Sequence, residues 1–66
     1  MKFRTRNTTY TIVREGDSAT IEGHPRYCPT PTPFRADAPP TVGQVFVFST
    51  FWHPHIRTTE VHEILE

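Results

Sequence analysis

The chain has 66 residues, with seven basic and seven acidic side chains and a formal net charge of zero. A domain of this size buries only ~60% of the surface of its unfolded chain, so its core is thin. The balanced charge argues against nonspecific binding of nucleic acid, which depends on neutralised phosphates. The single cysteine excludes a disulfide within the chain. No segment approaches the ~20 apolar residues that cross a bilayer, so we expect a cytoplasmic protein that binds no membrane.

A β-hairpin is predicted near the N-terminus. Residues 8–14 have the β-branched and aromatic composition of a strand, residues 15–18 form a turn cluster around Gly16-Asp17, and residues 19–22 return as a second strand. Tyr10 and Ile12 share one face of the first strand, and Ile21 lies on the inner face of the second.

Residues 23–33 differ from this pattern because they contain four prolines, three of them in the run Pro-Thr-Pro-Thr-Pro. Proline donates no hydrogen bond to a neighbouring strand, so these residues are predicted to be an ordered surface loop or a sheet edge. A short third strand is expected at residues 34–36.

Residues 44–52 form the clearest strand, and both of its faces are apolar. One face would carry Val45, Val47 and Phe51, which we expect in the core. The other would carry the aromatic row Phe46, Phe48 and Trp52. A thin core cannot cover both faces, so we expect this row to be the contact face for a partner. Tyr27 and Arg26 of the proline-rich loop would form its rim.

Residues 58–66 allow two interpretations. Val61, Ile64 and Leu65 have the spacing of a short amphipathic helix, whereas the β-branched start favours a strand with a bulge, which we prefer. The predicted fold is therefore all-β, a small SH3-like or related open barrel of about five strands, with a short C-terminal helix as the alternative. The basic N-terminal segment and acidic C-terminal segment would then be neighbouring strands.

The sequence predicts neither a metal site nor a catalytic cysteine. His24, Cys28, His53 and His55 include the side chains that bind zinc, but the paired cysteines of a zinc signature are missing. We therefore predict no metal and no cofactor. Cys28 as a nucleophile would need an oriented base, and no catalytic motif supplies one, so no enzymatic activity is expected.

Three binding functions follow from the pattern. A protein partner on the aromatic row is preferred, because aromatic residues are typical of interface centres. A nucleic acid is the first alternative, with Lys2, Arg4 and Arg6 as phosphate contacts on one strand face. Self-association through the same row, giving a homodimer, is the second.

The chain opens with Asn7-Thr8-Thr9-Tyr10, has a Val42-Gly43 turn before its apolar strand, and closes with Thr58-Thr59-Glu60-Val61 and Ile64. In this outline it resembles small β-rich proteins encoded by phages and mobile elements. The resemblance implies a compact interaction protein that blocks a host defence complex, as anti-CRISPR proteins do. The proline run and His53-Pro54-His55 are not part of that outline.

Overall fold

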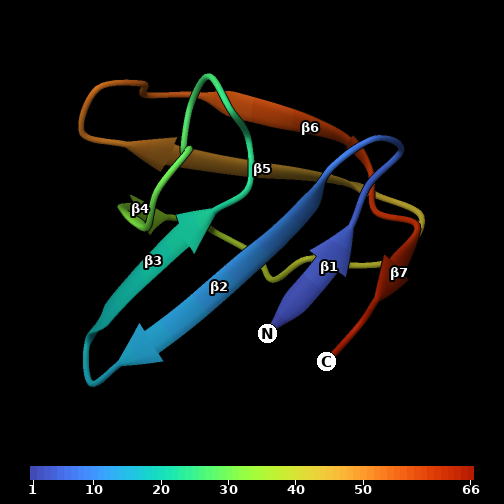
Figure 1. Cartoon of the computed structure of the whole chain (residues 1–66), viewed down its shortest axis with the longest axis horizontal. Coiled ribbons are helices and arrows are strands. Elements are labelled where there is room, and N and C mark those ends of the chain that lie inside the picture. The colour runs from blue at the N-terminus through green and yellow to red at the C-terminus, as the bar shows by residue number, and fades with distance from the viewer.

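The computed structural model describes residues 1–66 as seven β-strands without a helix (Figure 1). The strands are β1 (Lys2–Arg4), β2 (Thr9–Glu15), β3 (Ser18–Glu22), β4 (Thr32–Arg35), β5 (Val45–Thr50), β6 (Ile56–Glu60) and β7 (Glu63–Ile64). All neighbouring strands are antiparallel, in the order β6-β5-β4-β3-β2-β1-β7. The predicted all-β class is confirmed, with seven strands instead of about five. No helix has the length and apolar character required to span a membrane.

The sheet is curled, because its two edge strands, β6 and β7, follow one another in the chain. His62 lies between them, and its N–H donates to the carbonyl of Arg4 at 2.8 Å. The final segment therefore pairs with β5 through β6 and with β1 through β7. In Figure 1, β5 and β6 run in a different direction from β2 and β3, and the two termini lie close together. This arrangement encloses the core between the two parts of the sheet.

The predicted hairpin is confirmed by β2 and β3, which pair from Thr11↔Glu22 to Glu15↔Ser18. Gly16 in the connecting turn has a φ of 60°, a conformation that glycine adopts without steric cost. Tyr10, Ile12 and Ile21 are all buried, as their shared face predicts.

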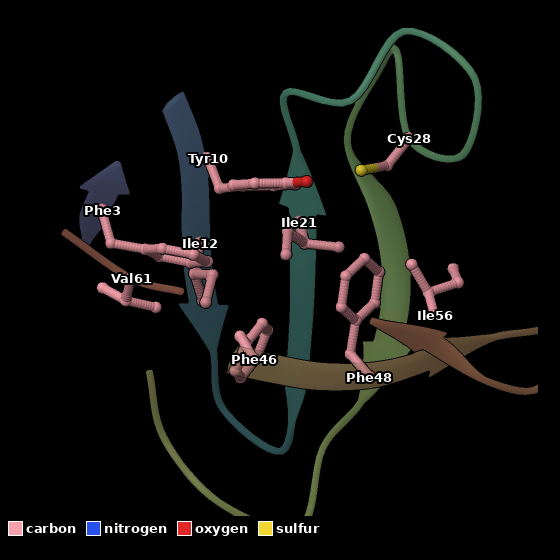
Figure 2. Packing of buried hydrophobic residues seen from close by; sticks show 9 residues of the cluster. All are labelled: Phe3, Tyr10, Ile12, Ile21, Cys28, Phe46, Phe48, Ile56 and Val61. Carbon is pink, nitrogen blue, oxygen red and sulfur yellow. The ribbon is translucent and has the colours of Figure 1, made fainter. Parts of the chain in front are cut away.

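The core is a single cluster of nine apolar residues (Figure 2). Its members come from both ends of the chain and its middle: Phe3, Tyr10, Ile12, Ile21, Cys28, Phe46, Phe48, Ile56 and Val61. The prediction that Phe46 and Phe48 form a contact face is wrong, since they are 3% and 2% exposed. Figure 2 shows both rings projecting from β5 toward β2 and β3. Their stacked rings, 5.5 Å apart, fill the space that the curled sheet encloses.

The prediction of a loop or edge at Pro33 is also wrong, because β4 lies between β3 and β5. The two halves of this strand pair with different neighbours. Thr32 and Pro33 pair with β3, whereas Phe34 and Arg35 pair with β5. The pairing with β5 therefore begins beyond the proline, and its missing N–H does not interrupt that ladder.

The C-terminal segment is extended, which excludes the alternative helix. The register of β5 and β6 shifts between Val45↔Glu60 and Val47↔Arg57, so the expected bulge lies in this strand. Within it, the buried hydroxyl of Thr58 accepts a hydrogen bond from the Phe46 N–H at 3.0 Å. The side chain thus satisfies a backbone donor that the bulge removes from the ladder.

Candidate functional site

The most exposed aromatic side chains lie in the turn between β5 and β6. Phe51 is 90% exposed and Trp52 is 71% exposed. The expectation that Val45 and Phe51 belong to the core is wrong, because Phe46 and Phe48 occupy the buried face of β5 and the alternate positions therefore face outward. Phe51 was therefore not predicted as a surface residue. The useful signal was the nearby Pro54, since proline restricts the backbone before it and often accompanies a turn.

Hydrogen bonds define the conformation of this turn. The Thr50 N–H donates to the His53 carbonyl at 2.8 Å, and the His53 N–H donates to the Thr50 hydroxyl at 3.1 Å. Between these two residues, the rings of Phe51 and Trp52 meet edge to face, with centroids 5.3 Å apart. The backbone thus holds two large apolar side chains outward as a preformed pair.

A groove lies beside this aromatic pair. It has a volume of about 470 Å³ and is lined by Pro33, Phe34, Arg35, Ser49, Thr50, Phe51 and Trp52. Phe34 connects the groove to the core, because its ring also packs against Phe48 with centroids 6.0 Å apart. One wall of the groove is therefore supported by the core of the protein.

The proline-rich loop packs against the other side of the turn. The ring of Tyr27 contacts His53 edge to face at a centroid distance of 4.9 Å. The Arg26 guanidinium lies 5.8 Å from the centre of the Tyr27 ring, within cation–π distance. Tyr27 and Arg26 were the predicted rim residues. The loop that carries them thus contacts His53, the residue that follows Trp52. We call Phe51, Trp52, His53, Tyr27 and Arg26 the aromatic turn surface.

Arg26 belongs to this surface, and Arg35 is the charged residue that lines the groove beside it. Arg26 and Arg35 form no ion pair, because the single ion pair of the protein joins Arg4 and Glu63. No acidic residue lines the groove beside the turn. A partner segment with exposed carboxylates would therefore complement the aromatic turn surface.

The predicted basic row of Lys2, Arg4 and Arg6 is interrupted. The Arg4 guanidinium binds the Glu63 carboxylate at 2.8 Å, across the pairing of β1 with β7. Arg6 lies beyond the end of β1, after the buried Thr5. The expected pairing of the basic and acidic ends is confirmed, and it removes Arg4 as a free phosphate contact.

The four metal-ligand candidates do not converge. No group of three or more histidine, cysteine or acidic side chains is positioned to hold a metal ion. The Cys28 side chain is in the core, where burial raises the pKa of its thiol, so neither metal binding nor nucleophilic attack is favoured. His24 Nδ1 accepts hydrogen bonds from the backbone N–H groups of Arg26 and Tyr27. His53 packs instead on Tyr27.

No family model, curated protein sequence or solved structure matches this chain.

Proposed function

We propose that this chain is a non-catalytic binding protein that docks on a protein partner through the aromatic turn surface. The observation that carries the proposal is the outward pair of Phe51 and Trp52, held by a hydrogen-bonded turn. Paired aromatic groups exposed to water are unfavourable for the free protein, and a partner that covers them gains their burial.

The chemistry of the surface favours a protein over other ligands. Tryptophan and arginine are enriched among the residues that dominate binding energy at protein interfaces. The turn is fixed by its own hydrogen bonds, so little conformational entropy is lost when it docks. Arg26 and Arg35 beside the aromatic groups would select a partner with acidic residues around an apolar centre.

The curled sheet with consecutive edge strands fits a small open barrel of the SH3-like or a related kind. Inhibition of a host defence complex, as in the phage proteins that the chain resembles, is the biological role that we propose for the docking. It rests on the sequence outline alone, since a fold does not determine a function.

The test is a pull-down from a lysate of the host cell, with the wild-type protein and its variants as baits. Wild-type protein should retain a partner that the double variant Phe51→Ser/Trp52→Ser loses. The matched control is Val13→Ser/Val42→Ser, which removes two other exposed apolar side chains. Loss of the partner by both variants, or by neither, would contradict docking through the aromatic turn.

Self-association is the rival use of the same surface. Light scattering on the purified protein distinguishes the two. A monomer leaves the aromatic turn free for a foreign partner, whereas a dimer that Phe51→Ser/Trp52→Ser dissociates would make the chain a homodimeric module instead.

A further inference from the structure

A second groove, which shares no lining residue with the aromatic turn surface, lies between the β1–β2 connection and β6. It has a volume of about 340 Å³ and is lined by Thr5, Asn7, Thr8, Tyr10, His24, Arg57, Thr58 and Thr59. Each of these eight side chains carries an N–H or O–H group, and none carries a carboxylate. Such a lining can donate several hydrogen bonds to an anion and offers no negative charge to a cation.

Arg57 supplies the positive charge of this groove. Its side chain is exposed on β6 and forms no ion pair or hydrogen bond within the protein. A free guanidinium presents several N–H donors in a planar fork, which matches the oxygen atoms of a phosphate group.

His24 is held in a defined orientation, and its hydrogen bonds select one tautomer of the neutral ring. Its Nδ1 accepts hydrogen bonds from the N–H groups of Arg26 at 3.0 Å and Tyr27 at 3.4 Å, and its ring packs on Tyr27. Because Nδ1 is an acceptor, the neutral ring carries its proton on Nε2. The side chain thus keeps one N–H donor that the protein does not use.

The threonines add hydroxyl donors. Thr59 Oγ1 accepts a hydrogen bond from the Arg6 N–H at 3.3 Å, which leaves its own proton available. Thr58 differs, because its hydroxyl donates to the Thr59 carbonyl at 2.6 Å and has a structural role. Thr59 is therefore the hydroxyl of β6 that can donate to a ligand.

From this combination we propose that the groove binds a phosphate-type oxyanion. Arg57 provides the charge, and His24 Nε2–H, the Thr59 hydroxyl and the Asn7 amide provide further donors. The ligand is either free phosphate or a phosphodiester of a nucleic acid strand, which share this chemistry. The site contains neither Phe51 nor Trp52, so it stands or fails independently of docking through the aromatic turn.

The test is a titration with inorganic phosphate followed by nuclear magnetic resonance at constant ionic strength. The wild-type protein should show saturable shifts at Asn7, Arg57 and Thr59. Arg57→Ala should weaken binding by about tenfold or more, the loss of one charge-assisted interaction. Arg14→Ala is the matched control, because it removes an exposed arginine outside this groove and should leave the affinity unchanged. Absence of saturable shifts, or equal loss in both variants, would overturn the proposal.

Thr59→Val provides a second variant that keeps the charge of the groove. It should weaken phosphate binding and leave the protein folded, because Thr59 is an exposed residue of β6. A parallel titration with a short thymidine oligonucleotide distinguishes the sources. Tighter binding of the oligonucleotide, lost in Arg57→Ala, assigns the site to a phosphodiester. Equal or weaker binding assigns it to free phosphate.

Discussion

The imidazole of His53 meets the ring of Tyr27 edge to face, with the ring centroids 4.9 Å apart. This contact joins the β5–β6 turn to the proline-rich loop between β3 and β4. The aromatic turn surface is therefore composite, and its geometry depends on two segments that are distant in the sequence.

The aromatic side chains of β5 and its turn should differ sharply in their contribution to stability. Phe48→Ser should lower the free energy of unfolding by about 3–5 kcal/mol, because it empties a core site. Phe51→Ser should change it by less than about 0.5 kcal/mol, since the side chain is almost fully exposed. Urea unfolding followed by circular dichroism measures both. Similar values for the two variants would contradict the placement of Phe48 and Phe51.

The Thr58 hydroxyl should be required at the bulge of β6. Thr58→Val leaves the buried Phe46 N–H without an acceptor and should cost about 1–3 kcal/mol. Thr58→Ser keeps the hydroxyl and loses one methyl group, which is worth about 0.8 kcal/mol. A valine variant as stable as the wild-type protein in chemical denaturation would contradict this role of the hydroxyl.

Gly23 should tolerate no side chain, because a Cβ there would lie 2.3 Å from the Thr9 carbonyl oxygen and its φ is 140°. Gly23→Ala should destabilise the protein by about 2–4 kcal/mol, the sum of overpacking and backbone strain. Gly16→Ala is the control, with open space around it and a φ of 60°. Its expected cost is about 1–2 kcal/mol. Thermal unfolding that ranks the two in reverse would contradict this close approach.

Stability should decrease in alkaline solution because of Tyr10. Burial raises the pKa of its phenol to about 12, with the Cys28 thiol as a smaller cause. Its pKa is ~10 in the unfolded chain, so the unfolded state loses the proton first as the pH rises. The stabilisation is complete below pH ~10 and is lost as the pH rises through ~12. Allowing for screening by solvent in the adjacent groove, the loss is about 1–2 kcal/mol.

Tyr10→Phe isolates this contribution, because phenylalanine retains the ring stacked on Phe3 and has no proton to lose. Denaturant unfolding measured across this pH range should show a flatter decrease for the variant. Parallel curves for the two proteins would contradict a raised pKa at Tyr10.

Local signals predicted part of this fold. The Gly16-Asp17 turn between alternating strands identified the β2–β3 hairpin, and opposite charges anticipated the contact of Arg4 with Glu63. The alternation of side chains in residues 44–52 predicted two faces of a strand but did not indicate which face is buried. That choice depends on the curl of the sheet, which places Phe46 and Phe48 inside.

The candidate site was predictable to a smaller extent. Trp52, Tyr27 and Arg26 were recognised by their residue types, but Phe51 was assigned to the core because the outer face of β5 was taken for the buried one. The contact between Tyr27 and His53 is a tertiary contact without a local sequence signal. The polar groove around Arg57 was missed for the same reason, since its residues come from four separate segments.

Trp52 is the single tryptophan of the chain, so its fluorescence reports directly on the aromatic turn surface. The most direct measurement is acrylamide quenching of this emission. It is made before and after addition of an excess of the partner that the wild-type protein captures from the lysate. Using a partner fragment without tryptophan keeps the signal specific. Docking through the turn predicts a shift of the emission to shorter wavelength and strong protection from quenching. Stable binding with unchanged emission and quenching would place the interface elsewhere and contradict the proposed function.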